Sequence, residues 1–466
     1  MKLVKIENFN LLVAFAINIA VIFFNANNCL AQISIIRESQ TEKTIRDIAS
    51  KLFISAGLNA QNIKIYIVND NSINAFVSGG QNIFINLGLI QKFDTPDVIA
   101  GVLAHEIGHI AGGHLAKSSE IYSKNLTTTL IGYLLGVGAI ASGNSDAGTA
   151  LILGSSHIGN RMSLKYSRNQ EEEADILALQ YLQKSLYPNS GLQNILNYFQ
   201  QENVGFKNQI DEFELTHPIS SSRIKLIKNF NEQNPISKHK LPNNIYYNFA
   251  RSKAKLKGFL GEISEELTKN SNNLDDNSLV VAAINYHRKG DFKNSQIILD
   301  KIIKKFPNDG FLYELKADLL LSENKIYDAI FHYKKALKFL EAESKVLSQI
   351  NVASAIIKLK SDDKFLLDFA LKNLKNAMIY EDDNPLIYQE LAKIYFLQNL
   401  KSLENLALAQ YNFLINDLKK SKKYAEDAIV EFDKCHDKIL AKKDKNCQFL
   451  YLKIKAQDLL IFQEEK

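Results

Sequence analysis

The hexapeptide at residues 104–109, Ala-His-Glu-Ile-Gly-His, constrains this chain more than any other stretch. It lies in residues 95–115, which predict a helix because they begin with the capping pair Thr-Pro and continue with apolar residues at helical spacing. His105 and His109 are four residues apart, so both imidazoles leave one face of that helix and can share a metal ion. Glu106 lies about 100° further round, where it can reach a water beside the metal without being a ligand. The motif therefore predicts a zinc hydrolase site.

A catalytic zinc needs three protein ligands, and two candidates for the third follow the motif. A metzincin places its third histidine six residues after the second, and because His114 falls one residue early that class is rejected. The segment 167–175 predicts a helix that carries Glu171 and Asp175 on one face, with small alanines that allow close approach to a neighbouring helix. Glu171 would supply the third ligand, Asp175 would accept the free N–H of a liganding histidine, and Arg168 would steady either carboxylate.

The residues before the motif predict a small sheet. Residues 34–56 have a helical apolar pattern, and 63–68 predict a strand. Residues 74–77 and 83–85 flank a Ser-Gly-Gly-Gln-Asn turn and predict a hairpin. One strand of this sheet either lies beside a cleft, where an extended peptide can pair with it, or serves only as scaffold.

Composition narrows the function classes. The 466 residues carry a formal net charge of +5 without a basic patch interleaved with aromatics, which argues against nucleic acid as a partner. Residues 1–31 have a positive start, a short apolar run and a small-residue site, so they predict a signal peptide cleaved after Ala31, with an uncleaved anchor as the alternative. Export makes a disulfide between Cys435 and Cys447 plausible; two unpaired buried thiols are the alternative.

An apolar, glycine-rich stretch follows the motif, within residues 126–153. Its two apolar pieces, 126–140 and 150–153, are short for a membrane span. Three interpretations remain open: a mobile lid, a hairpin that touches the membrane beside the active site, or a buried helical pair.

The C-terminal half changes character. Residues 231–244 contain two prolines, several asparagines and a basic cluster, and predict a linker. Residues 245–466 are almost wholly helical in pattern, with small residues and tyrosines recurring at a period near 34. This period resembles tetratricopeptide repeats, which stack helix pairs and present a concave surface to a partner. An irregular helical bundle is the alternative.

Five stretches carry a family resemblance: Asn74–Phe76, Gly88–Leu89, Val102–His109, Ser167–Arg168 with Glu171–Asp175, and Thr216–Pro218 followed by Arg223–Ile224. Together they resemble the gluzincin zinc peptidases of the HtpX and CAAX-prenyl-protease family, numbered forty-eight in peptidase classifications. The chain lacks the pair of long membrane spans typical of HtpX and looks most like the exported branch of the family, which has a tetratricopeptide tail. The resemblance implies zinc on His105, His109 and Glu171, with Glu106 as catalytic base and Asp175 behind the ligands.

His217, followed by a proline, has three interpretations. It could stabilise the developing oxyanion as a catalytic residue. The resemblance instead implies a removable fourth zinc ligand that keeps the enzyme latent, and a structural loop histidine is the plain alternative. Arg223 either supports the site from behind the ligands or is a structural salt-bridge partner.

The expected fold is α+β and predominantly helical: a gluzincin-type metallopeptidase domain with a small sheet at 32–230, then an all-α tetratricopeptide-like solenoid. The leading hypothesis is a periplasmic zinc endopeptidase in envelope and outer-membrane protein quality control, whose repeats recruit misfolded or misassembled envelope proteins. The alternative is a periplasmic chaperone or scaffold that binds the barrel-assembly machinery through its repeats, with latent or minor peptidase activity. A processing peptidase with one dedicated substrate is a third hypothesis.

Overall fold

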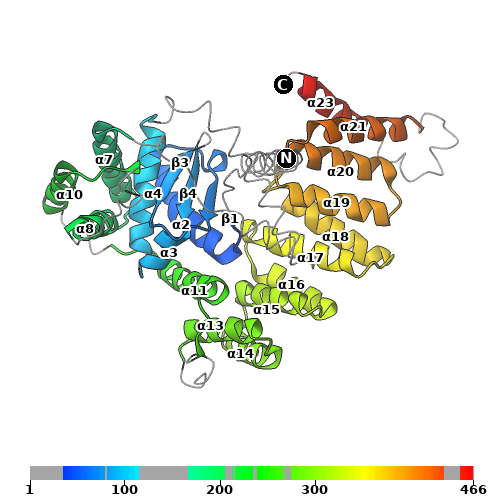
Figure 1. Cartoon of the computed structure of the whole chain (residues 1–466), viewed down its shortest axis with the longest axis horizontal. Coiled ribbons are helices and arrows are strands. Elements are labelled where there is room, and N and C mark those ends of the chain that lie inside the picture. The colour runs from blue at the N-terminus through cyan, green and yellow to red at the C-terminus, as the bar shows by residue number, and fades with distance from the viewer. Residues whose placement is uncertain are drawn as a thin grey trace, which may run out of the picture.

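A computed structural model of the chain describes these residues: 35–78, 81–114, 166–204, 213, 216–234, 239–265, 267, 274–434 and 452–464. The predicted signal peptide, the stretch 126–153, Cys435 and Cys447 lie outside the described residues. A mixed α/β half with a small sheet stands beside a curved stack of helix pairs (Figure 1). The prediction of a predominantly helical α+β chain that ends in a helical solenoid is confirmed.

The sheet has four strands in the order β1-β2-β4-β3. Their bounds are Ile35–Ile36 (β1), Ile65–Val68 (β2), Ala75–Ser78 (β3) and Asn82–Asn86 (β4). Strands β3 and β4 form the predicted antiparallel hairpin, with Phe76 opposite Phe84, whereas β2 and β4 run parallel. Strand β3 is therefore an edge of the sheet among the described strands, and the site described below lies against this edge.

The helices of this half are α2 (Ser39–Ala56), α3 (Leu87–Lys92), α4 (Pro96–Ala111), α7 (Arg168–Lys184), α8 (Ser190–Val204) and α10 (Ser221–Gln233), with a 3-10 turn η2 (Ala60–Asn62). Helix α4 packs against α2, α7 and α8, and their apolar faces share one buried core with the sheet. The predicted helix at 34–56 is wrong at its start. Helix α2 begins only at Ser39, because the Glu38 carboxylate accepts from the backbone N–H groups of Gln40 and Thr41, and the two residues of β1 pair with β2.

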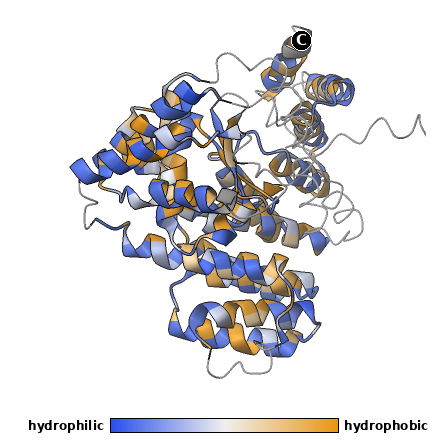
Figure 2. Cartoon of the chain, turned by 60° about the vertical axis from the view of Figure 1, so that its left-hand side comes forward, coloured by the Kyte–Doolittle hydropathy of each residue, from blue (hydrophilic) through white to orange (hydrophobic). Residues whose placement is uncertain are grey.

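The C-terminal half is a solenoid of antiparallel helix pairs. Helix α11 (Asn243–Leu260) leads into α13 (Asp276–Arg288) with α14 (Phe292–Lys305), α15 (Gly310–Ser322) with α16 (Ile326–Phe339), α17 (Val346–Lys358, after the 3-10 turn η5, Glu343–Lys345) with α18 (Lys364–Ala377), α19 (Pro385–Leu397) with α20 (Lys401–Leu414), and α21 (Leu418–Asp433) with α23 (Lys453–Glu464). Hydrophilic and hydrophobic residues alternate around these helices, as Figure 2 shows. The buried side chains form separate clusters along the stack. Among the helices that the structure describes, none has the length and apolar character needed to cross a bilayer.

The two halves contact each other through buried polar groups. Helix α11 packs on both α2 and α13, and the buried Lys255 ammonium lies 2.8 Å from the Glu38 carboxylate. The hydroxyl of Ser39 on α2 donates to Glu314 on α15 over 2.8 Å. Further along the solenoid, Arg37 forms a salt bridge of 2.7 Å to Glu381. The solenoid is thus held against the N-terminal end of α2, on the far side of the sheet from β3.

Candidate metal centre

The first residues of the site lie on α4, within the segment 95–115 that the sequence predicts as a helix. Pro96 occupies the first turn after Thr95, although the Thr95 hydroxyl makes no capping hydrogen bond. His105 and His109 are one turn apart and buried, with their Nε2 atoms 3.1 Å from each other. Both Nε2 atoms therefore face one point beside the helix.

Helix α7 brings a carboxylate to this point. The side chain of Ser167 and that of Gln170 form a capping box that starts α7, so Glu171 falls in its first turn. Glu171 is fully buried, with Oε1 3.3 Å from His109 Nε2 and Oε2 3.4 Å from His105 Nε2. The predicted pairing of this helix with the histidine helix is what the structure has.

A glycine and an alanine set the spacing of these two helices. A Cβ placed on Gly108 would lie 2.7 Å from the carbonyl oxygen of Ala174. Only hydrogen fits there, so the backbones of α4 and α7 approach more closely than any larger residue allows. Gly108 lies between His105 and His109 on α4, and Ala174 follows Glu171 by three residues on α7. The close contact is therefore next to the proposed ligands on both helices.

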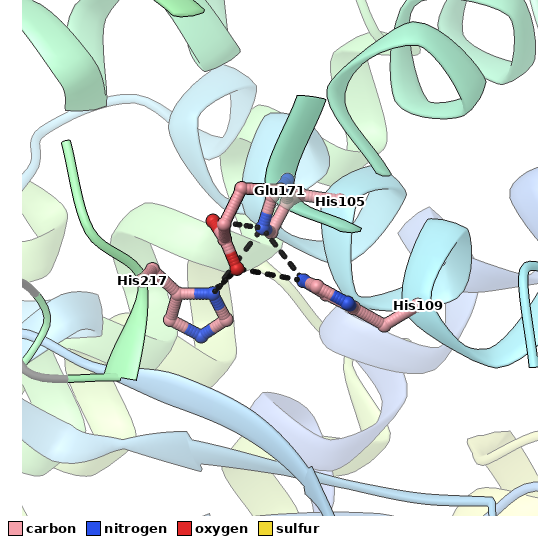
Figure 3. A group of neighbouring side chains, drawn as sticks. All are labelled: His105, His109, Glu171 and His217. Carbon is pink, nitrogen blue, oxygen red and sulfur yellow. Dashed lines mark hydrogen bonds and ion pairs between the residues drawn. The ribbon is translucent and has the colours of Figure 1, made fainter. Parts of the chain in front are cut away.

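His217 completes the cluster from a separate segment, as Figure 3 shows. Its Nδ1 lies 3.1 Å from Glu171 Oε1 and 3.3 Å from His105 Nε2. One ligand atom from each of His105, His109, Glu171 and His217 lies within 4.8 Å of the others. Imidazole nitrogens with one carboxylate oxygen are a donor set that suits zinc and several other divalent transition metals. The residues present therefore fit a divalent metal ion.

Asp175 and Arg223 lie behind these side chains. Asp175 Oδ1 is 2.9 Å from His105 Nδ1, while the Arg223 guanidinium contacts both carboxylates, at 2.6 Å from Asp175 Oδ2 and 2.6 Å from Glu171 Oε2. Burial alone would raise the pKa of Asp175, but the adjacent Arg223 charge holds it below its usual value. The prediction for Arg168 is wrong: this side chain is exposed at the start of α7, and Arg223 from α10 steadies the carboxylates instead.

Glu106 faces the cluster without belonging to it. It is fully buried, and neither of its carboxylate oxygens has a hydrogen-bond partner among the described residues. His217 Nε2 lies 3.5 Å from Glu106 Oε1. Burial raises the pKa of the Glu106 carboxyl above its ordinary value, against the nearby His217 and His105, which lower it.

Two further side chains were missed as parts of the site. Tyr166 stacks on the His109 ring, with centroids 3.7 Å apart and planes 19° apart. His114, rejected above as a ligand, lies with its Nδ1 2.9 Å from His109 Nδ1. The sequence signal for Tyr166 is its position next to the Ser167 cap, whereas the spacing of His114 excludes it as a metzincin ligand and indicates no other role.

A helix that carries two histidines around a glutamate, with a carboxylate from a second helix, is an arrangement typical of metallopeptidases. Residues 39–231 match Peptidase family M48, and the predicted metallopeptidase is confirmed. The chain is 24% identical over 374 residues to the beta-barrel assembly-enhancing protease of Yersinia pestis, covering 78% of this chain and 74% of that protein. The protein of the same name in Escherichia coli strain K12 is 25% identical over 303 residues, or 63% of this chain and 60% of its own length. The metalloprotease YcaL of that strain is 29% identical over 161 residues, which are 34% of this chain and 58% of YcaL.

Proposed function

We propose that the protein is a zinc endopeptidase of the cell envelope, which cleaves misfolded or misassembled envelope proteins that its helical solenoid recruits. One observation carries the proposal: four buried donor atoms converge within 4.8 Å beside the buried Glu106, whose oxygens accept no hydrogen bond from any residue that the structure describes. A buried carboxylate without a partner is costly in a folded protein and is retained where a reactant completes it.

His105, His109 and Glu171 would hold the metal. When bound, a divalent cation polarises the scissile carbonyl and lowers the pKa of water at the site. Asp175 Oδ1 lies 2.9 Å from His105 Nδ1, and a carboxylate there favours a proton on Nδ1, which leaves the lone pair of Nε2 for the metal. Arg223 balances the charge of the two buried carboxylates, which keeps both ionised in a water-excluded site.

Glu106 is the general base of this proposal. Its buried carboxylate takes the proton of the attacking water and then gives that proton to the leaving amine nitrogen. A carboxyl whose pKa lies above the ordinary value for glutamate is suited to both steps, because it is a better proton acceptor and still releases the proton.

His217 acts as a removable fourth ligand. Its Nε2 lies 3.3 Å from the carbonyl oxygen of Ala75, which can only accept, so Nε2 carries the ring proton. The lone pair is then on Nδ1, the atom that faces Glu171 and His105. This tautomer favours a latent, four-ligand site over an oxyanion donor, which would need an N–H directed at the substrate.

The names of the relatives support the envelope assignment and protein substrates. The solenoid supports recruitment, because stacked helix pairs present an extended surface to a partner. Export to the periplasm and docking on the barrel-assembly machinery belong to the same proposal.

Zinc analysis and casein cleavage by the purified chain test the proposal. We expect Glu106→Gln to keep one zinc per chain and to lose about 10²–10⁴ in rate, while Glu262→Gln, at an exposed position, serves as control. His217→Ala should keep zinc and cleave faster than the wild type. Full casein cleavage by Glu106→Gln, or a wild-type chain that binds no zinc, would refute the assignment. If Glu106→Gln rescues a deletion strain completely, the scaffold function is the correct one.

A further inference from the structure

We propose that His114 is a positioning residue for the metal centre: it fixes the tautomer and ring orientation of His109, and Glu173 in turn fixes His114. This inference deepens the proposed function and rests on its metal site. Each histidine of the helix motif would then have its own support: Asp175 behind His105, and His114 with Glu173 behind His109.

The chain reverses direction at the end of helix α4, which places the His114 side chain next to His109. Gly113 adopts a left-handed backbone with φ +66°, and the backbone N–H of His114 donates to the His109 carbonyl over 3.1 Å. This is the glycine-dependent pattern that closes a helix C-terminus. Gly112 gives the imidazole its space, since a Cβ there would lie 2.7 Å from His114 Nε2. Two glycines thus fold His114 back over the last turn.

The contacts define one consistent set of proton positions. His109 directs Nε2 at the cluster, 3.3 Å from Glu171 Oε1, so a metal ligand at that atom needs the ring proton on Nδ1. That N–H points at His114 Nδ1, 2.9 Å away, which must accept. The proton of His114 is therefore on Nε2, which lies 3.2 Å from Glu173 Oε2 and donates to it. A carboxylate can only accept, so Glu173 fixes the direction of the whole chain of hydrogen bonds.

The surroundings argue against a plain packing role for His114. Its side chain is only 4% exposed, yet both ring nitrogens have partners, one leading to the metal position and one to Glu173. A buried residue needed only for its volume requires no such pair. The Glu173 side chain is 60% exposed, so the contacts from His109 through His114 to Glu173 lead from the metal centre to the surface. On the other side of the centre, Asp175 beside His105 is buried.

The test measures zinc affinity in the full chain by competition with a chelator, together with the visible spectrum of the cobalt-substituted protein. His114→Phe keeps the ring volume but cannot accept from His109, and we expect its zinc Kd to rise on the order of 10–100-fold with an altered cobalt spectrum. His114→Asn places an oxygen where Nδ1 lies and should recover most of the affinity. His287→Phe, in the solenoid, is the matched control and should bind zinc as the wild type does.

Gly112→Ala supplies a second perturbation that leaves His114 itself unchanged. The added methyl group displaces the imidazole, so zinc Kd should rise although alanine suits this helical backbone. The melting temperature of each metal-free variant shows whether it folds as the wild type does. Wild-type zinc affinity in both His114→Phe and Gly112→Ala would overturn the inference, as would equal losses in His114→Phe and His114→Asn. A wild-type chain that binds no zinc would instead refute the proposed function, and this inference with it.

Discussion

Replacement of Gly108 by alanine tests whether the approach of α4 and α7 creates the metal centre. The new methyl carbon would lie 2.7 Å from the Ala174 carbonyl oxygen, whereas ordinary contact begins at 3.4 Å. Helix α7 must therefore retreat by roughly 0.7 Å to restore ordinary contact, because both partners are backbone or fixed to it. Glu171 lies one turn earlier on α7 and moves with it, and ligand distances tolerate only about 0.2 Å.

We expect Gly108→Ala to weaken zinc binding on the order of 10–100-fold and to destabilise the fold by about 1–3 kcal/mol. Chelator competition measures the first quantity and urea denaturation followed by circular dichroism the second. Gly101→Ala is the matched control, since its methyl group would lie 2.4 Å from the Leu192 backbone nitrogen and press on α8 instead of α7. That variant should lose stability and keep its zinc affinity. Wild-type zinc affinity in Gly108→Ala, or equal losses of affinity in both variants, would refute the reasoning.

Three further predictions concern buried charge and the metal. Arg223→Gln leaves the Asp175 and Glu171 carboxylates buried without their cation and should cost about 3–5 kcal/mol of unfolding free energy in urea, with Arg223→Lys closer to the wild type. Burial, with Asp318 nearby, raises the pKa of Glu314 from 4.5 to about 8, so the folded chain holds a proton that the unfolded chain releases. The free energy of unfolding should then decrease as the pH rises from 4.5 to 8. Urea denaturation at several pH values in this range should show a smaller decrease for Glu314→Gln than for the wild type. Chelation of the metal should lower the melting temperature, since zinc at 100 times its Kd stabilises the fold by about 2.7 kcal/mol. An unchanged melting temperature would contradict binding of the metal by the folded chain.

The sequence predicted the local parts of the site well. A spacing of four residues puts His105 and His109 on one helix face whatever surrounds them. The alanine-rich face of the Glu171 helix indicated a close helix contact, which the structure has at Ala174. The start of α2 was mistaken because apolar periodicity does not show that Ile35 and Ile36 pair with a strand thirty residues later in the chain.

The errors and omissions at the site share one cause. Arg168 was chosen because it stands one turn from Glu171, yet its side chain leaves the helix on the exposed side. Arg223 reaches both carboxylates from a helix about fifty residues further on, which helical spacing cannot reveal. The hydrogen bond of His114 to His109 depends on how two glycines bend the chain after α4. Sequence spacing does not show that bend, so it tests His114 only as a ligand.

By itself the sequence determined the local features of the chain. These are two imidazoles and a glutamate on one helix, an acidic helix with small residues, and a series of helix pairs after them. Those properties depend on residues within a turn or two of each other, where backbone geometry is fixed. The tertiary structure alone decided that Arg223, and not Arg168, contacts both carboxylates, and which ring nitrogen of His217 faces Glu171. Such contacts join residues up to 142 positions apart, and only the packing of α4, α7 and the sheet edge brings them within hydrogen-bond distance.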